Sequence, residues 1–236
     1  MNGKLYLVPV TIGSPDYYYV IPSGVLQIIK SLRIFIVEDL RSARRFLRLI
    51  DPTFPIDDCD FIIINKHSSG QDMESALSHL GPGSDAGLMS EAGMPGIADP
   101  GSGLVLRAHS AGFNVVPLSG PSSIFLALMS SGLNGQNFAF NGYLPRNKAG
   151  RTRELRRLET LAGGGQSQIF METPYRNMKL LQDILATLKV DTYLCIAANI
   201  TYGDEFIMTR RISEWRKTAF PNIDRKPAIF ILGITP

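Results

Sequence analysis

AGLMSEAGMPGIADPGSGLVLRAHSAG (residues 86–112) combines a strand, an irregular loop and a helix in one stretch, and this order decides the fold. Residues 86–89 form a short apolar run that is typical of a buried strand. Residues 90–101 contain three glycines and two prolines. These disfavour helix and strand because glycine raises the entropic cost of ordering and proline lacks a backbone donor. The stretch therefore predicts a strand, a loop of defined shape and then a helix.

The same alternation runs along the chain. Strand-like runs occur at 5–10, 33–39, 61–65, 86–89 and 114–118, with helical patterns between them. Further helices and strands are expected at 121–132, 138–144, 151–162, 168–172, 175–188, 192–198 and 228–234. Such alternation predicts an α/β fold, with a largely parallel sheet in the first half that is covered on both faces. We expect two α/β domains, 1–117 and 118–236.

Composition limits the classes of protein to which the chain can belong. With 236 residues and 44% hydrophobic content it can bury a substantial core. The net charge of +3 is mild, so any anionic partner is expected to bind at local basic patches. Cys59 and Cys195 lie far apart without a CxxC pattern, which predicts neither a disulfide framework nor a metal site and favours a reduced, cytoplasmic setting. No apolar run is long enough for a spanning helix, so neither export nor membrane insertion is expected.

Unusual chemistry follows several of the predicted strands. Residues 9–15 follow the first strand, Glu38 and Asp39 the second, and residues 91–99 the fourth. Because the carboxyl ends of parallel strands lie along one edge of a sheet, these groups are expected to line a common cleft. Glu172 also ends a predicted strand, where a buried carboxylate is costly unless it is paired. For residues 90–101 taken alone, and for the segments that contain Glu172 and Asn199, a plain turn is an equal alternative.

Common catalytic motifs are absent from the sequence. GSGLVL has Leu106 in place of the third glycine of a dinucleotide fingerprint, and no phosphate-binding P-loop pattern occurs. Neither a GxSxG elbow nor a triad spacing around His67, His79 and His109 is found, which disfavours a serine hydrolase. Ser122 and Ser123 open an apolar helix, where they either cap the helix or face a ligand at its amino terminus.

Two basic segments stand out. Each is either a solvent-exposed helix face or a surface that binds the phosphate groups of a nucleic acid. One contains Arg146, Lys148, Arg151, Arg153, Arg156 and Arg157, and the other contains Arg41, Arg44, Arg45 and Arg48.

The loops, taken together and in order, resemble those of the tetrapyrrole methylase superfamily of S-adenosylmethionine-dependent methyltransferases. They are most similar to the branch that methylates a ribose 2'-oxygen in small-subunit (16S) ribosomal RNA. The signatures of that branch are GTPIGN, CEDTR, SDAGTPxISDPG, PGxSA, FxGFLPxK and ESPHR. Here they read VTIGSP, VEDLR, SEAGMPGIADPG, SGPSSIFLALMSSGL, FAFNGYLPRNK and ETPYR. Val10 and Thr11 in the first loop, Glu91, Met94 and Tyr175 depart from the pattern.

The resemblance implies two α/β domains with S-adenosylmethionine in the cleft between them, usually in a homodimer. Carried over by position, the implied cofactor contacts are Pro9, Glu91, Ala92, Gly93, Met94, Ile97, Ser122, Ser123, Met171, Asn199 and Ala228. A ribose hydroxyl is a poor acid, so a general base is expected near it, and Glu38, Asp39 and Glu172 are the candidates. Arg41, Arg151, Arg153, Arg156, Arg157 and Arg176 are expected to hold ribosomal RNA phosphates, either in free RNA or in the small subunit.

Two alternatives remain open from the sequence. The first is a small-molecule methylase of the tetrapyrrole type, in which the arginines would meet the carboxylates of a large anionic ring. The second is a module that binds the cofactor without catalysis, for which the substituted loop positions are the support.

Overall fold

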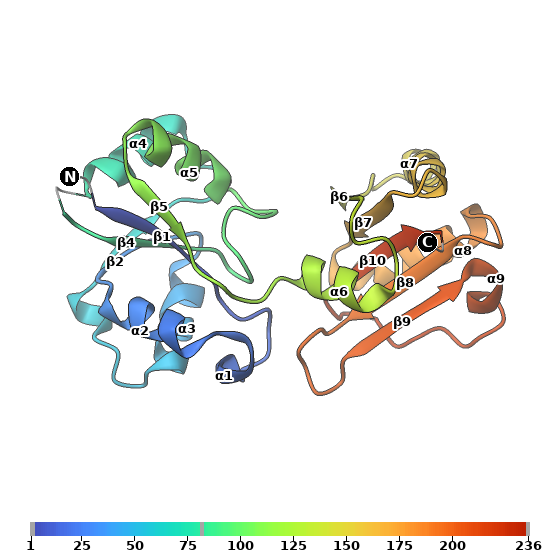
Figure 1. Ribbon diagram of the computed structural model, residues 1–236, viewed down its shortest axis with the longest axis horizontal. Helices are drawn as coiled ribbons and strands as arrows, with labels where there is room; N and C mark the ends of the chain where they lie inside the picture. Colours follow the sequence, from blue (N-terminus) through green and yellow to red (C-terminus); the bar gives the residue numbers. More distant parts are fainter. Residues whose placement is uncertain (1–2, 81–82, 235–236) are drawn as a thin grey trace. The chain divides into compact units, whose positions relative to one another are not determined.

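The computed structural model describes residues 3–80 and 83–234 (Figure 1). The chain divides into two compact units, of which the first ends at Ser122 and the second begins at Ser123. The boundary expected after Pro117 falls at the end of a strand, shortly before this division.

The first unit is built on a five-stranded parallel sheet in the order β3-β2-β4-β1-β5. The strands are β1 (Lys4–Val8), β2 (Ile34–Val37), β3 (Asp60–Ile63), β4 (Ala86–Met89) and β5 (Asn114–Pro117). Val8 and Val37 both pair in register with Met89 of the central strand. The chain therefore leaves β1, β2 and β4 at the same edge of the sheet.

Helices cover both faces of this sheet (Figure 1). The helices α2 (Ser23–Ser31) and α3 (Leu40–Ile50) lie on one face, whereas α4 (Gly70–Ser78) and α5 (Gly101–Ser110) lie on the other. Successive residues of a strand point to opposite faces, and accordingly Phe35 packs with Leu47 of α3 whereas Ile36 packs with Leu104 of α5. The predicted parallel sheet with two covered faces is thus confirmed for this unit.

The second unit contains a mixed sheet in the order β6-β7-β10-β8-β9. Its strands are β6 (Phe138–Tyr143), β7 (Ser167–Met171), β8 (Tyr193–Ala198), β9 (Phe206–Arg211) and β10 (Ala228–Gly233), and its helices are α6 (Ser123–Ser131), α7 (Lys148–Gly163), α8 (Asn177–Thr187) and α9 (Ile212–Trp215). The β6–β7 pair is parallel, whereas β10 pairs antiparallel with β7 and β8, and β8 pairs antiparallel with β9. Leucines of α7 and α8 pack on Phe170 and Phe230, whose rings stack at 5.8 Å.

Four of the described elements were not predicted from the sequence: the strand β9, the helix α9, the short helix α1 (Tyr17–Val20) and the 3₁₀ turn at Ile56–Asp58. The strand β9 is half-buried at the sheet edge and carries Thr209, Arg210 and Arg211, so it lacks the apolar run by which the other strands were found. The short 3₁₀ turns η1 (Ile56–Asp58) and η2 (Pro174–Arg176) complete the fold. Across residues 3–80 and 83–234, no helix combines the length and apolarity needed to cross a bilayer.

Candidate functional site

The loops that follow β1, β2 and β4 are joined by backbone hydrogen bonds at the carboxyl edge of the first sheet. The amide of Val10 donates to the carbonyl of Gly93 at 2.9 Å, and the amide of Glu38 donates to the carbonyl of Met89 at 3.2 Å. Pro9 is buried, and a Cβ built on Gly120 would lie 2.2 Å from the Pro9 Cβ. Only glycine fits at position 120, so the loop after β5 packs directly on the loop after β1.

Asp99 fixes the shape of the glycine-rich loop, residues 90–101. Its carboxylate accepts the amide of Gly96 at 2.8 and 2.9 Å and the amide of Gly101 at 2.7 Å. Burial raises the pKa of Asp99, against the effect of these amides. Gly93 and Gly96 have φ angles of +73° and +83°, in the left-handed region that glycine tolerates best. Asp99 was predicted only as part of residues 91–99, although an aspartate two residues before a helix commonly accepts hydrogen bonds from nearby backbone amides.

Two hollows border this loop within the first unit. One, of about 350 Å³, is lined by residues 10–15, Ser90, Glu91, Ala92 and, from α3, Arg45. The other, of about 320 Å³, is lined mainly by apolar groups, among them Met94, Ile97 and Leu118. Both volumes fall in the range of small-molecule sites. A Cβ built on Gly96 would meet nothing within 4 Å, so the bare backbone there is open to close approach by a ligand.

The three candidate bases occupy different environments. Glu38 is half-buried, and its pKa is raised first by desolvation and then by the negative charges of Glu91 and Asp99. Asp39 instead caps α3 by accepting the amide of Ser42 at 2.7 Å, and the hydrogen bonds from Ser42 lower its pKa. A raised pKa makes a carboxylate a better proton acceptor, so Glu38 is the better base of these two.

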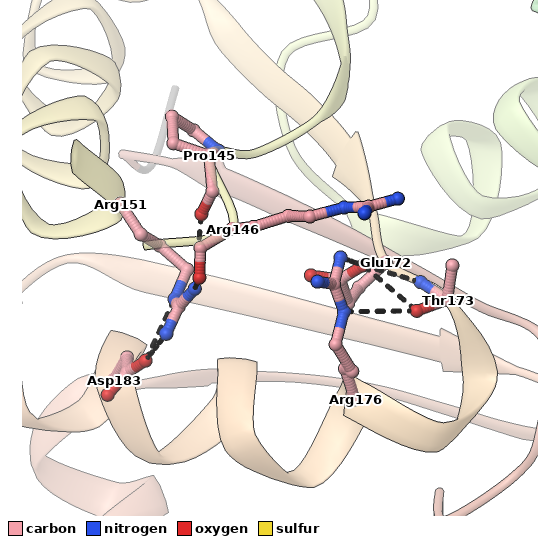
Figure 2. A network of polar contacts seen from close by, with 7 residues as sticks. All are labelled: Pro145, Arg146, Arg151, Glu172, Thr173, Arg176 and Asp183. Carbon is pink, nitrogen blue, oxygen red and sulfur yellow. Dashed lines mark hydrogen bonds and ion pairs between the residues drawn. The ribbon is translucent and has the colours of Figure 1, made fainter. Parts of the chain in front are cut away.

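Glu172, the third candidate, is engaged by its neighbours in the second unit (Figure 2). Its Oε1 accepts the amide of Thr173 at 2.7 Å, the Thr173 hydroxyl at 3.2 Å and a guanidinium N–H of Arg176. The Arg176 Nε donates in turn to the Thr173 hydroxyl at 3.1 Å. The buried carboxylate therefore has the partner that its position at a strand end requires, and this contact holds η2 against the end of β7.

Arg151 also has a structural role (Figure 2). Its side chain is 7% exposed and forms an ion pair with Asp183 of α8, to which Nε donates at 2.8 Å. The same guanidinium donates to the carbonyls of Pro145 and Arg146 at 3.1 and 2.7 Å. The expectation that Arg151 contacts RNA phosphates is corrected by this burial, because its donors are directed at the protein interior.

The remaining arginines of the predicted phosphate-binding set are accessible. Arg41, Arg153, Arg156 and Arg157 are exposed, and Arg157 pairs with Glu154 at 2.7 Å. Lys148, Arg153 and Arg156 line an open depression of about 610 Å³ on α7. Arg176 is half-buried by its bonds to Thr173 and Glu172.

Three predicted cofactor contacts lie along one edge of the second sheet. Met171 ends β7, Ala228 begins the antiparallel β10, and Asn199 follows β8. The amide of Asn199 donates to the carbonyl of Pro227 at 2.9 Å, which brings this edge together. The Asn199 side chain donates to Asp204 at 3.0 and 3.1 Å. Ser122 is buried at the end of the first unit, and Ser123 is the first residue of α6.

Among residues 3–80 and 83–234, no group of three or more histidine, cysteine or acidic side chains is arranged to hold a metal ion.

Comparisons with known proteins agree with the arrangement of loops and sheets. The family model of tetrapyrrole (corrin/porphyrin) methylases matches residues 4–215. A ribosomal RNA small subunit methyltransferase I from Escherichia coli is 32% identical over 90% of this chain and 71% of its own length. The protein of that name from Vibrio cholerae is 33% identical over the same shares. The methyltransferase CobJ has a similar fold, with a TM-score of 0.62, 14% identity and coverage of 98% of this chain and 93% of its own.

The match thus spans both units and all six of the loops on which the resemblance was recognised. The chain belongs to the tetrapyrrole methylase family and is a methyltransferase of that family.

Proposed function

We propose that this chain transfers a methyl group from S-adenosylmethionine to a ribose 2'-oxygen of small-subunit ribosomal RNA. The observation that carries the proposal is the identity of 32–33%, over 90% of the chain, with relatives that are named as ribosomal RNA small subunit methyltransferases. The exposed arginines of α3 and α7 support an anionic polymer as substrate.

The residues present fit S-adenosylmethionine. The two hollows beside the glycine-rich loop offer apolar walls, open glycine backbone and the carboxylate of Glu91. When bound, the cofactor would supply an electrophilic methyl group on a positively charged sulfur. From the first unit we assign its binding to Pro9, Glu91, Ala92, Gly93, Met94, Ile97 and Ser122, and from the second to Ser123, Met171, Asn199 and Ala228.

Glu38 is the group that we propose accepts the proton of the ribose hydroxyl. Its partial burial and the neighbouring charges of Glu91 and Asp99 raise its pKa, so the carboxylate binds a proton more strongly than an exposed glutamate does. Asp39 is held by Ser42 and caps α3, and Glu172 is held by Arg176 beside η2, so we assign both a structural role. The rest of the acceleration would come from alignment of the acceptor oxygen and exclusion of water.

Arg41, Arg153, Arg156 and Arg157 are proposed to bind RNA phosphates, and Arg176 is proposed to orient the turn η2 through its bonds to Thr173 and Glu172. We further propose that the protein acts in the cytoplasm as a homodimer. Light scattering of the purified chain tests the homodimer, since a monomer at micromolar concentration would contradict it.

The experiment that tests the reaction uses S-adenosylmethionine labelled in its methyl group. The protein is incubated with small ribosomal subunits, with the free RNA or with a porphyrinoid, and the RNA is then hydrolysed with alkali. Label is expected in RNA, at a linkage that resists alkali, because a methylated 2'-oxygen cannot attack the neighbouring phosphate. Label that enters only the porphyrinoid would contradict the proposal. Leu106→Ala, an exposed change on α5, is the matched control for the activity of the preparation.

A further inference from the structure

Three consecutive tyrosines form an exposed aromatic surface beside the candidate site. Tyr17, Tyr18 and Tyr19 make up most of α1, which follows the loop of residues 9–15. The rings of Tyr17 and Tyr18 lie 4.2 Å apart between centroids and are tilted by 33°. Tyr18 is 72% exposed and Tyr19 78% exposed. One face of the Tyr18 ring is thus covered by Tyr17, while most of its surface is open to solvent.

This aromatic surface is held in place by its surroundings. Asp16 caps α1 by accepting the amide of Tyr19 at 3.3 Å, and its own amide donates to the hydroxyl of buried Ser14 at 3.2 Å. Tyr17 packs against the core of the first unit, together with Val20. A side-chain hydrogen bond with Tyr18 is the main reason that the pKa of Tyr17 is raised to about 12. Large exposed rings that are ordered before binding suit recognition, because little entropy remains to be lost.

The neighbouring helix α3 supplies positive charge. Arg41, Arg44, Arg45 and Arg48 are all exposed, and in the described ranges none of the four takes part in a salt bridge. Arg45 lines the same hollow as Ser14 and Pro15, the residues that lead into α1. The aromatic surface and the basic face of α3 therefore adjoin one another and the loop after β1.

We propose that Tyr18 and Tyr19 stack on unpaired bases of the RNA substrate while the α3 arginines bind its phosphates. The inference rests on the proposed function, and it adds the requirement that the RNA beside the acceptor nucleotide be single-stranded. Aromatic rings bind unpaired bases by stacking, whereas paired bases in a helix present no free face. A base on the open side of Tyr18 continues the stack that Tyr17 begins.

A membrane surface fits these residues less well. The apolar side of α3 is already occupied, because Ala43, Phe46, Leu47 and Ile50 are buried in the core. No continuous apolar helix face is left on α3 for insertion among lipids, and α1 is only four residues long. Flat rings with hydroxyl groups lie next to guanidinium groups that form no salt bridge within the described residues, and this combination matches the alternating bases and phosphates of a single strand.

Fluorescence anisotropy of the full chain with labelled RNA of 12 nucleotides tests the proposal. The probes are a single strand, a duplex and a single strand that lacks bases at its centre. Tyr18→Ala and Tyr19→Ala are each expected to weaken binding of the single strand by about tenfold, within the range known for loss of one stacked base. The strand without bases should bind the wild type and both variants equally. Tyr18→Phe, which keeps the ring, should bind like the wild type.

Two controls separate stacking from charge and from misfolding. Arg45→Ala should reduce the slope of the logarithm of the binding constant against the logarithm of the salt concentration by about 0.7, which corresponds to one phosphate contact on a single strand. Tyr18→Ala should leave this slope unchanged. Leu106→Ala removes another exposed apolar side chain, which is 68% exposed on α5, and should leave binding unchanged.

The results distinguish this inference from the proposed function. If the wild type methylates ribosomal RNA and the tyrosine variants bind and react normally, stacking is wrong and the function stands. If the variants lose affinity for the single strand but the wild type transfers no methyl group to RNA, the function is wrong and stacking stands. Normal binding of the single strand by both variants, or a loss seen only with intact subunits or with anionic vesicles, would overturn the stacking proposal.

Discussion

Replacing Asp183 by asparagine removes the charge partner of Arg151 with little change in shape. The Arg151 and Asp183 side chains are only 7% and 5% exposed, so the buried guanidinium of the variant keeps only neutral acceptors, namely the carbonyls of Pro145 and Arg146 and the amide oxygen of the new asparagine. An uncompensated buried charge of this kind costs about 3–5 kcal/mol. Since a domain is typically stable by about 5–15 kcal/mol, the variant should lose a large part of the stability of the second unit.

Urea unfolding followed by the fluorescence of Trp215 measures this loss. Trp215 is the only tryptophan and is buried in the second unit, so its signal reports on the part of the chain that contains the ion pair. Arg157→Ala removes an exposed ion pair with Glu154 on α7 and should cost less than about 1 kcal/mol. The double variant Arg151→Met, Asp183→Leu should regain most of the stability, because apolar groups can replace a buried pair. A free energy of unfolding for Asp183→Asn within about 1 kcal/mol of the wild type would refute the reasoning.

Three further predictions concern the first unit. Glu38→Gln should lower the rate of methyl transfer by a factor of about 10²–10⁴, while calorimetry should still show binding of S-adenosylmethionine. The wild-type rate should rise as the pH increases through the raised pKa of Glu38. Glu91→Gln should move that rise to lower pH, because the charge of Glu91 helps to raise the pKa of Glu38. Asp99→Ala removes the acceptor for the amides of Gly96 and Gly101, so calorimetry should give weaker cofactor binding, and unchanged affinity would show that the loop keeps its shape without it. Asp39→Ala should lower the melting temperature but not the rate at saturating substrates, and Asp39→Ser should restore the cap. Because folding lowers the pKa of Asp39, the stability that the cap contributes should be complete above the ordinary aspartate pKa and be lost as the pH falls through the lowered value. An Asp39→Ala variant as stable as the wild type at pH 7 would contradict this role.

The sequence predicts the first unit well because helices cover both faces of its sheet, so that its central strands are apolar runs. The strand of residues 86–89 was identified with its observed bounds, since the run is apolar throughout and polar Ser90 and Glu91 follow it, before the glycines and prolines of the loop. The strand β9 was missed because this half-buried edge strand carries Thr209, Arg210 and Arg211 after only three apolar residues. Antiparallel pairing in the second sheet depends on which strands meet, and that information is not local.

Candidate chemistry was harder to predict than the fold, because neighbours in space decide it. Glu38 and Asp39 are adjacent in the sequence, yet the pKa of one is raised and that of the other is lowered. The difference comes from burial near Glu91 and from the cap at Ser42. Arg151 looks like the other arginines of its segment, and only its contact with Asp183, on another helix, shows that it is structural.

The position of β1 in the first sheet has a consequence for the order of assembly during synthesis. The strands that flank it, β4 and β5, begin at Ala86 and Asn114. At the usual rate of translation, β1 waits on the order of 5–20 s before both partners have been made. The pair β2–β3 is closer in sequence and can form earlier. The hydrogen bond between the Val10 amide and the Gly93 carbonyl requires the loops after β1 and β4, which are distant in the sequence. The candidate cofactor site is therefore among the last parts of the unit to form, and a nascent chain released early would lack it.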